Sequence, residues 1–367
     1  MNESEHFESS SNFDSTPIRT TANVLWGLTA IIGIPANIFV LAAIVYFRDM
    51  RTISNIYIFN LAVADLIFLL SVPILFSQPN GDWTLGVAMC KAYFSSYTAS
   101  QFASAVFIAI LSFDRFLAVC RPLTSSSLRT PQAAFFLSVT AWVMVILETV
   151  PLMMFVTVVS ADRGDDTIER KCTPYFGDNN KNDYRGSSDN LEIIEQNLIM
   201  SRRFFVSYTF ALSYLIPLIA VWFFYTKIIL RMCQRRRQMY LKRASTRKKT
   251  TKVTIMGLAI VISYTLCLLP FWIATWFIEL NLFRGNEVAL IGVSLFGFCL
   301  QYINSAANPF LYVFLSDSFK KNIAKLIHSE RSEKSITGNQ DQTDSTKLLI
   351  TRSKDSSFVS HQPQHVL

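Results

Sequence analysis

The chain has 367 residues, of which 51% are hydrophobic and 16% are charged, and its formal net charge is +8. Average soluble domains carry roughly 25% charged residues, so this composition argues against a disordered chain, a coiled coil and an ordinary cytosolic enzyme. The basic residues lie in short runs between apolar stretches, which argues against a nucleic-acid partner.

Seven long apolar segments follow one another along the chain. A membrane-spanning helix needs about 20 consecutive apolar residues, and helices are the only open architecture that satisfies every backbone polar group in lipid. The sequence therefore predicts an all-α membrane protein, a seven-transmembrane helix bundle. The apolar cores are Val24–Phe47, Ile56–Phe76, Met89–Cys120, Ala133–Val159, Phe204–Met232, Val253–Leu280 and Val288–Leu315.

The charges of the loops predict the orientation. Ten lysines and arginines, and no acidic residue, lie within residues 231–252, between the fifth and sixth apolar segments. Because strongly basic loops stay in the cytoplasm, this run predicts an N-terminus outside the membrane and a C-terminus inside. Asn2, in the sequence Asn-Glu-Ser, is then a candidate for glycosylation on the outer side.

The segment boundaries predict four regions. Residues 1–22 form an extracellular N-terminal tail, and residues 23–315 form the seven-helix domain. In residues 316–328 the apolar side chains share one face and the lysines lie elsewhere, which predicts a short amphipathic eighth helix on the inner leaflet. Residues 329–367 are polar and rich in Ser and Thr, which predicts a disordered cytoplasmic tail.

Several polar side chains interrupt the apolar segments. Polar groups are costly inside a membrane, so each is a functional candidate. A cluster of such oxygen atoms suits a small cation or ordered water, or it simply holds the helices together by hydrogen bonds. The residues alone leave both interpretations open. The side chains are Asn37, Asp65, Ser104, Asn304 and Asn308.

Asp114 and Arg115 close the third apolar segment at its cytoplasmic boundary. A lone basic residue at a helix end usually extends to the lipid headgroups, and composition favours that interpretation. The alternative is a charge pair that changes partners when helices move.

Two of the six cysteines lie on the oxidising side of the membrane. Cys90 opens the third segment, and Cys172 lies in the loop after the fourth. A disulfide persists in that environment, so we predict this pair, with two free thiols as the alternative. The other four cysteines are expected to stay reduced.

From about Val24 to Ile327, these features resemble the rhodopsin-like (class A) G-protein-coupled receptors. Each expected span carries a motif of that family, in order. The matching residues are Gly33-Ile-Pro-Ala-Asn37, Leu61-Ala-Val-Ala-Asp65, Trp83, Cys90, Asp114-Arg115-Phe116, Trp142, Cys172, Pro217, Tyr225, Pro270 and Asn308-Pro-Phe-Leu-Tyr312.

Residues 112–122 and 302–321 further resemble the somatostatin, opioid and allatostatin-C peptide-receptor branch. Three positions depart from the expected pattern. Phe116 replaces the Tyr that usually follows the arginine in the family. Tyr97 stands where somatostatin and opioid receptors carry a ligand-pairing Asp, and Leu268 stands where the family usually carries Trp. The cytoplasmic half therefore matches the branch better than the ligand pocket does.

The resemblance implies a multi-pass plasma-membrane receptor, not an enzyme, that couples an extracellular neuropeptide to a heterotrimeric G protein of the Gi/o class. The implied coupling residues are Asp114, Arg115, Tyr225, Asn308, Pro309 and Tyr312. The implied ligand residues are Tyr97, Gln101, Thr275, Phe298, Gln301 and Tyr302, with Phe271 and Trp272 beside them. The implied sodium-binding residues are Asp65, Ser104, Asn304 and Asn308.

No cofactor is expected beyond sodium as an allosteric ion. The resemblance also implies an arrestin, a receptor kinase and membrane lipid as partners. Glu279 and Glu287, at the expected rim of the pocket, are predicted to steer a cationic peptide.

Other functions lack the residues that they need. A photoreceptor requires a lysine in the seventh segment for a retinal Schiff base, and Val288–Leu315 contains none. The hydrolase patterns HExxH and GxSxG are absent. One alternative stays open, a class A receptor for a non-peptide small molecule.

Overall fold

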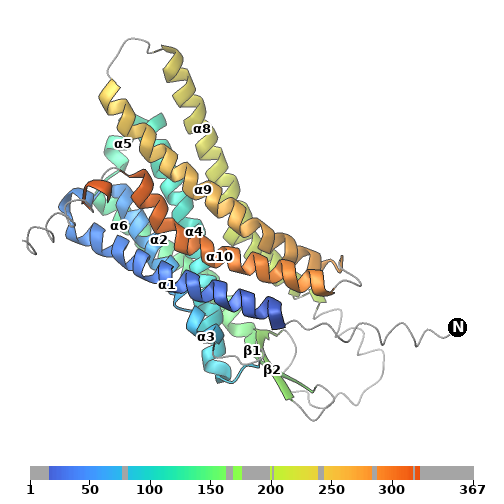
Figure 1. Ribbon diagram of the computed structural model, residues 1–367. Helices are drawn as coiled ribbons and strands as arrows, with labels where there is room; N and C mark the ends of the chain where they lie inside the picture. Colours follow the sequence, from blue (N-terminus) through green and yellow to red (C-terminus); the bar gives the residue numbers. More distant parts are fainter. Residues whose placement is uncertain are drawn as a thin grey trace, which may run out of the picture. The chain divides into compact units, whose positions relative to one another are not determined.

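The computed structural model is predominantly helical (Figure 1). It describes residues 16–76, 82–162, 168–175, 199–200, 202–238, 244–282, 287–316 and 319–322. The described residues up to Ser316 belong to one compact unit, and Asp317 opens a second.

The first unit contains long helices joined by short helical turns. The helices are α1 (Thr16–Tyr46), α2 (Ile53–Leu69), α3 (Val72–Phe76), α4 (Gly86–Cys120), α5 (Pro122–Leu128), α6 (Pro131–Phe155), α8 (Ile216–Gln238), α9 (Ala244–Glu279) and α10 (Glu287–Leu315). A 3-10 turn covers Arg48–Met50, and a π-helical turn, Ala211–Leu215, joins helical residues 202–210 to α8.

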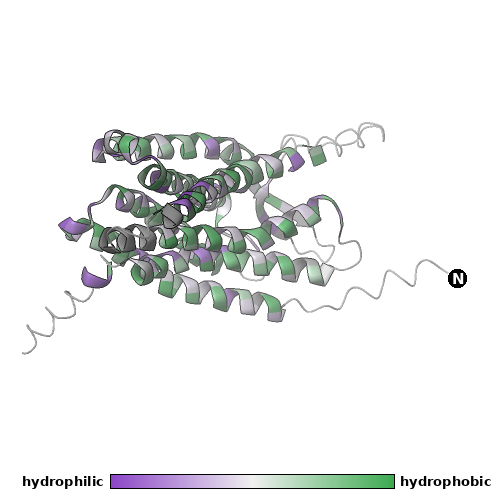
Figure 2. Cartoon of the chain, turned by 90° about the horizontal axis from the view of Figure 1, so that it is seen from above, coloured by the Kyte–Doolittle hydropathy of each residue, from purple (hydrophilic) through white to green (hydrophobic). Residues whose placement is uncertain are grey.

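Six of the described helices are long and apolar enough to cross a membrane. They are Thr20–Tyr46, Ile53–Phe76, Gly86–Cys120, Pro131–Phe155, Arg202–Gln234 and Thr254–Glu279. The expected seventh segment coincides with α10, which has 29 residues and packs against α1 and α9. Figure 2 shows hydrophobic residues along the whole length of the helices.

The outer faces of the helices are apolar, whereas several buried side chains are polar. Phe136 and Met154 of α6 are 68% and 73% exposed, while Asn37 and Asp65 are fully buried. A soluble domain hides such apolar side chains, so this reversal is what a helix bundle in lipid requires.

Helix α4 runs through the middle of the bundle, where it contacts α2, α6, α8 and α9 (Figure 1). Its central position explains why its residues contribute to every site described below. At about 1.5 Å per residue, the 35 residues of α4 connect points roughly 50 Å apart.

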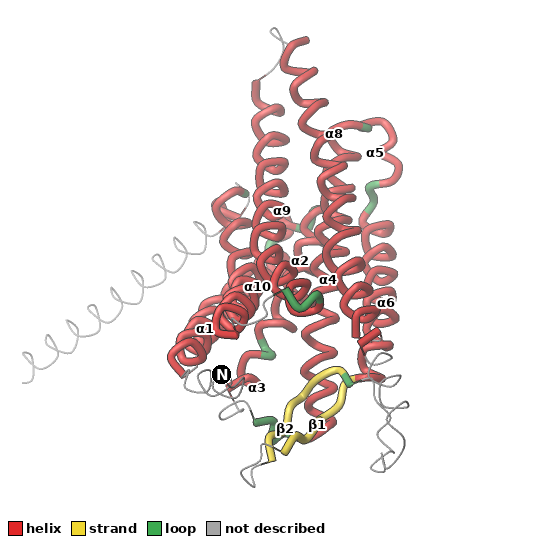
Figure 3. The backbone as a smooth tube through the Cα atoms, turned by 90° about the vertical axis from the view of Figure 1, so that its right-hand side faces the viewer, coloured by secondary structure: helices red, strands yellow, loops and turns green. Residues whose placement is uncertain are grey.

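A β-hairpin closes one end of the bundle (Figure 3). Strand β1 (Val156–Asp162) continues directly from α6 and pairs antiparallel with β2 (Ile168–Pro174), with Val158 opposite Cys172. Cys90 and Cys172 form the predicted disulfide. We call this end of the bundle the hairpin end, and the end that contains Arg115 the arginine end.

The loop before α4 holds the hairpin in place. The backbone N–H of Trp83 donates to the Arg170 carbonyl at 2.8 Å, and the Arg170 N–H donates to the Asp82 carboxylate at 2.7 Å. The Trp83 side chain is 2% exposed and packs with Tyr93 and Val156. Strand β2 is thereby fixed by two hydrogen bonds to the loop before α4 and by the disulfide to α4 itself.

The predictions for the N-terminal tail, the eighth helix and the C-terminal tail fall partly or wholly outside the described residues. Helix α1 begins at Thr16, within the segment 1–22 that the sequence assigns to the N-terminal tail, and Asn2 lies outside the described residues. Of the predicted eighth helix, only residues 319–322 are described, and these are helical. The tail 329–367 lies outside them.

Candidate functional site

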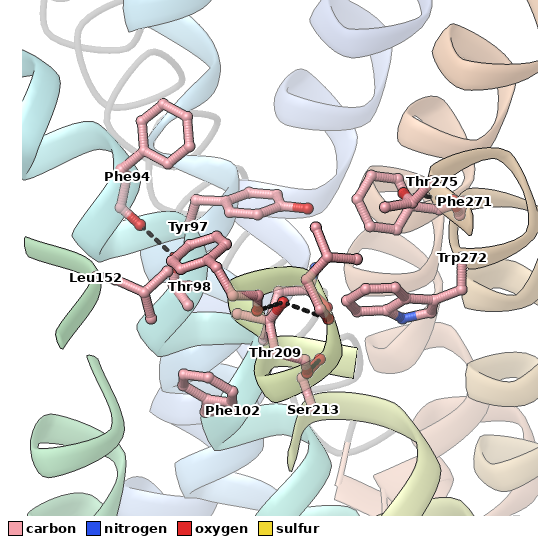
Figure 4. Close-up of a pocket in the computed structure, with 13 residues that line it drawn as sticks. Phe94, Tyr97, Thr98, Phe102, Leu152, Thr209, Ser213, Phe271, Trp272 and Thr275 are labelled. Carbon is pink, nitrogen blue, oxygen red and sulfur yellow. Dashed lines mark hydrogen bonds between the residues drawn. The ribbon is translucent and has the colours of Figure 1, made fainter. Parts of the chain in front are cut away.

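An aromatic cavity of about 180 Å³ lies in the half of the bundle nearer the hairpin end (Figure 4). Its walls come from α4, α6, the helical residues 202–215 and α9. The lining residues are Phe94, Tyr97, Thr98, Gln101, Phe102, Leu152, Phe205, Val206, Thr209, Ser213, Phe271, Trp272 and Thr275. None of these side chains carries a charge, so the cavity offers aromatic surface and neutral hydrogen-bonding groups only.

Helical spacing aims the side chains of α4 into the cavity. Residues three or four apart share one face of a helix, and the lining residues of α4 follow that spacing: Phe94, Tyr97, Thr98, Gln101 and Phe102. Figure 4 shows the side chains of α4 and α9 facing each other across the cavity.

Pro217 explains the unusual backbone on the third wall. A proline has no N–H to donate to the carbonyl four residues earlier, which here belongs to Ser213, inside the π-helical turn. The hydroxyl of Tyr264, from α9, donates to that carbonyl instead. Tyr214 reciprocates by donating to the Thr265 carbonyl at 3.1 Å. The helix wall and α9 are therefore joined directly beneath the cavity.

A neutral hydrogen-bond network backs the cavity on the side of α10. The side-chain carbonyl oxygen of Gln301 accepts from the Tyr97 hydroxyl at 3.0 Å and from the Gln101 amide at 2.9 Å. Gln301 is 2% exposed. Position 97 therefore offers no carboxylate to a ligand. It carries the Tyr97 hydroxyl, which already donates to the side-chain amide of Gln301.

The predicted ligand residues divide into two layers. Tyr97, Gln101 and Thr275 line the cavity, as do Phe271 and Trp272. The other three lie behind them and are not lining residues. They are Phe298, whose ring lies 5.7 Å from that of Tyr97, Gln301 in the network above, and Tyr302, which stacks on Phe68 at 4.1 Å.

Sequence reasoning missed the contributions of α6 and of residues 205–213. Thr209 and Ser213 are four residues apart, just before a proline inside an apolar segment. That spacing was the available signal that two hydroxyls share a face at a local irregularity. Leu152 offered none, because one more leucine in an apolar helix is uninformative.

Glu279, which the sequence places at the rim of the cavity, does not have the surroundings expected of a charge that steers a peptide. Glu279 is only 7% exposed, and its two carboxylate oxygens lie 2.9 and 3.1 Å from Nε of Arg202. Arg203 also donates to the Glu279 backbone carbonyl at 3.3 Å. A paired and buried carboxylate exerts little long-range attraction, so Glu279 is a link between helices rather than a steering charge. The Glu287 side chain lies outside the described residues.

A second polar site lies deeper, between α2, α4 and α10. Asp65 is fully buried, and Asn308 donates to its Oδ2 at 2.9 Å, while its Oδ1 has no hydrogen-bond partner. Ser104 and Asn304 line a neighbouring space of about 10 Å³, which suits one water-sized particle. Among the described residues, no three His, Cys, Asp or Glu side chains gather to hold a metal ion.

Asn37 has a different role from that of Asp65. Its amide donates to the carbonyl of Gly33 in its own helix at 3.0 Å and to that of Ser305 in α10 at 3.2 Å. Asn37 therefore joins α1 to α10. For this residue, the polar side chain serves to hold helices together by hydrogen bonds rather than to line a cation site.

The arginine end is organised around Asp114, which is 4% exposed. Its carboxylate accepts from the Ser54 hydroxyl at 2.8 Å and from Arg129 at 2.6 and 3.2 Å. Arg115 Nη2 lies 3.3 Å from the same carboxylate. Arg115 thus pairs with its neighbour instead of extending alone to the headgroups.

Sequence reasoning missed Arg129. Its position gave a signal, because it directly precedes Thr130, which caps α6 by accepting from the Ala133 N–H. The predicted coupling residues Tyr225 and Tyr312 are both fully buried. The Tyr225 hydroxyl lies against Gly257 of α9, where an added Cβ would be 2.0 Å from its oxygen.

Comparison with known proteins identifies the family. A model of the 7 transmembrane receptor (rhodopsin family) matches residues 36–312. Somatostatin receptor type 4 of Rattus norvegicus is 31% identical over 310 residues, covering 84% of this chain and 72% of the relative. Somatostatin receptor type 2 of Mus musculus is 30% identical, with 83% and 76% covered. The chain belongs to the rhodopsin family of seven-transmembrane receptors and is a multi-pass membrane protein.

Proposed function

We propose that this receptor binds an extracellular peptide in the aromatic cavity and transmits binding to a heterotrimeric G protein, with Gi/o as the expected class. The observation that carries the proposal is the similarity to receptors named for somatostatin over four-fifths of the chain. The N-terminus and the hairpin end face the outside, and the arginine end faces the cytosol.

The peptide we expect differs from somatostatin in one chemical respect. The cavity lining has no carboxylate to pair with a ligand lysine. Binding therefore rests on burial of an aromatic or aliphatic side chain and on neutral hydrogen bonds to groups such as Gln101 and Thr275. The resemblance implies that somatostatin binds through a Lys–Asp contact, so mammalian somatostatin is expected to activate this receptor poorly.

A non-peptide small molecule is the second candidate. The uncharged aromatic lining suits such a ligand, but its size is limited, because about 180 Å³ is less than the roughly 300–1,000 Å³ of pockets that enclose drug-sized ligands. A peptide meets the same limit by inserting one side chain while the rest of it lies against the hairpin. A small ligand needs no contact with the hairpin. Shortening residues 163–167 should therefore weaken the binding of a peptide and leave the binding of a small ligand unchanged.

We propose that Arg115 is the residue that meets the G protein when α9 moves away from the bundle at the arginine end. Asn308, Pro309 and Tyr312 lie on α10, which packs extensively against α9. A movement of α9 is therefore accompanied by repacking along α10, next to Asp65.

Sodium is proposed as an allosteric ion at Asp65. The unpartnered Asp65 Oδ1 supports this, since a buried carboxylate oxygen without a donor is costly unless a cation or water meets it. One carboxylate with hydroxyl and amide oxygens from Ser104, Asn304 and Asn308 suits a monovalent cation. Bound sodium would supply the positive charge that the described residues around Asp65 lack.

The tail beyond residue 328 is proposed as the region that a receptor kinase modifies and an arrestin then binds. It contains Ser329, Ser332, Ser335, Thr337, Thr343, Ser345 and Thr346. Each phosphate adds a charge of about −1.5 to −2, which suits a basic partner.

The proposed function is tested by nucleotide exchange on purified G protein. The receptor in lipid nanodiscs is incubated with fractions of a neuropeptide library, with somatostatin and with a small-molecule library, and GTPγS binding is measured. We expect one or more peptides to raise exchange and Arg115→Ala to abolish that rise at equal surface expression. Activation by non-peptide ligands alone would support the second candidate, and unchanged exchange in Arg115→Ala would contradict the coupling role.

A further inference from the structure

A groove opens between α4 and α8 at the arginine end, outside the aromatic cavity. Its volume is about 590 Å³. Helix α4 and the residue after it contribute Phe116, Cys120 and Arg121, and α8 contributes Phe223, Lys227, Leu230, Arg231 and Gln234. None of these residues belongs to the ligand, sodium or coupling sets assigned above.

Aromatic contacts join α4 and α8 next to the groove. Phe224 of α8 packs between Phe113 and Phe116 of α4, with ring centroids 5.4 and 5.5 Å apart. The Cys120 thiol donates to the Lys227 backbone carbonyl at 3.7 Å. The two helices that form the groove are therefore in direct contact with each other.

The wall formed by α8 combines apolar and cationic side chains on one helical face. Phe223, Lys227, Leu230 and Arg231 follow the three- and four-residue spacing of a single face. Phe223 and Leu230 are each 54% exposed. The Lys227 ammonium lies 5.5 Å from the centre of the Phe223 ring, so its charge stands above apolar surface.

The three cations of the groove are not compensated by the described part of the chain. Arg121, Lys227 and Arg231 have no ion pair there, whereas Arg115 and Arg129 share Asp114. The sequence that follows α8 adds no acid before residue 252. The groove thus presents three positive charges that no acidic residue in the described part of the chain neutralises, and such a site suits a bound anion.

The depth of the groove matches lipid headgroups. The candidate spans end at Cys120 and Gln234, and both residues line it. The span that ends at Gln234 has 33 residues, roughly 50 Å of helix, whereas the hydrocarbon core is about 30 Å thick. Its last turns therefore extend into the headgroup layer.

We propose that this groove binds the headgroup of an anionic phospholipid. The phosphate lies among Arg121, Lys227 and Arg231, and the acyl chains run over Phe223 and Leu230. The basic loop next to the groove assigns it to the cytoplasmic leaflet, where anionic lipids are abundant. This inference requires the membrane assignment but not the peptide ligand or the coupling mechanism.

Native mass spectrometry tests the proposal. The full-length receptor in detergent is titrated with phosphatidylinositol bisphosphate or with phosphatidylcholine, and the fraction carrying each lipid is counted. We expect preferential binding of the anionic lipid. One cation near a membrane surface is worth about a fivefold change in affinity, so the variant Arg121→Gln/Lys227→Gln/Arg231→Gln should lose roughly a hundredfold.

A matched variant controls for total charge. Arg48→Gln/Lys320→Gln/Lys321→Gln also removes three exposed cations but leaves the groove intact. It should bind the anionic lipid as the unmodified receptor does, and Arg231→Lys should retain most of the binding. Equal losses in both triple variants would mean diffuse attraction and would overturn the proposal.

Two further arms separate the other occupants. Free inositol trisphosphate at the same concentration should not displace the lipid, because it lacks the chains that cover Phe223 and Leu230. Equal competition would assign the groove to a soluble anion. In nanodiscs of phosphatidylcholine alone, the groove variant should support normal nucleotide exchange. Lost exchange together with unchanged lipid binding would assign this surface to the G protein.

Discussion

Asp114 receives hydrogen bonds or ion-pair contacts from Ser54, Arg115 and Arg129, and this sharing has a consequence for Arg115. Removing the only partner of a buried carboxylate costs several kcal/mol. Arg129 makes the shorter contacts, 2.6 and 3.2 Å, so Asp114 remains paired when Arg115 moves away. In the proposed coupling mechanism, Arg129 is therefore a positioning residue that would make release of Arg115 less costly.

We predict that Arg129→Gln lowers both basal and agonist-driven nucleotide exchange. A hydrogen bond to a charged group contributes about 1.5–3 kcal/mol, so exchange should fall on the order of tenfold at constant surface expression. Arg129→Lys should restore part of the activity, and Arg48→Gln, at an exposed arginine of the neighbouring 3-10 turn, should change nothing. A higher basal rate in Arg129→Gln would mean that this residue restrains Arg115 instead.

At the same scale, Tyr97 combines ring packing with one hydrogen bond. Its ring contacts Phe68 and Phe298, and its hydroxyl donates to Gln301. We predict that Tyr97→Phe weakens the potency of the activating peptide about fivefold, the value of one neutral hydrogen bond, and that Tyr97→Ala weakens it more. Concentration–response curves check this. Equal effects of both substitutions would show that the ring itself contributes nothing.

Individual residues were predictable where their chemistry is unusual for their surroundings. Asp65 and Asp114 stand out in apolar segments and Cys172 stands out in a polar loop, and the structure gives each a defined partner. Glu279 stood out equally, but it was predicted to steer a peptide, and its pairing with Arg202 was not predicted. The two residues are 77 positions apart, and no local pattern connects them.

At the scale of elements, helix positions followed from hydropathy but helix irregularities did not. The apolar core predicted at Phe204–Met232 corresponds to helical residues 202–210, the π-helical turn and α8. Pro217 signals that a carbonyl loses its donor. Only the fold shows that Tyr264 supplies the replacement, because this bond joins two helices 51 residues apart.

The attachment of the hairpin predicts a pH dependence. The backbone N–H of Arg170 donates to Asp82, and with the Arg170 guanidinium it holds the pKa of that carboxyl below its usual value. A lowered pKa in the folded state means that the contact stabilises at neutral pH. The contribution is lost only as the pH falls below the unfolded value of about 3.9 and through the folded one.

Asp82→Asn should therefore lower the melting temperature of the receptor by the same amount at pH 7 and pH 5. The difference from the unmodified receptor should shrink below about pH 4, because both proteins are then neutral at position 82. Thermal unfolding in detergent, followed across this pH range, checks the expectation. A difference that grows in acid would contradict the assigned direction of the pKa shift.

At the scale of the molecule, the order of the spans was predictable and their mutual packing was not. Seven apolar segments and the family motifs indicated the bundle. The cavity, however, is formed by four separate walls, and the contribution of residues 205–213 depends on how α8 packs against α4. Apolar segments are nearly uniform in composition, so the sequence does not specify which faces meet.

Asp65 lies buried where α2 meets α10, and this position yields a prediction about the whole receptor. It bonds to Asn308 of α10, and Asn304, one turn earlier, accepts from Ser263 of α9 at 3.1 Å. A cation held at Asp65 would therefore favour the packing of α9 and α10 seen here. An ion that stabilises the arrangement to which agonists bind less well must weaken agonist binding, and agonists must weaken ion binding equally.

We predict that raising sodium lowers agonist affinity and that Asp65→Asn removes most of this effect. The coupling between two such sites is typically about 1–3 kcal/mol, so the sodium-dependent shift in affinity should lie between roughly 5- and 150-fold. Potassium at equal ionic strength controls for screening of exposed charges, which affects both cations alike. Asp65→Asn keeps the size of the side chain and its contact with Asn308 but loses the charge that holds the ion. An equal sodium effect in the variant and the unmodified receptor would remove Asp65 from this role, and an equal effect of potassium would reduce it to general screening.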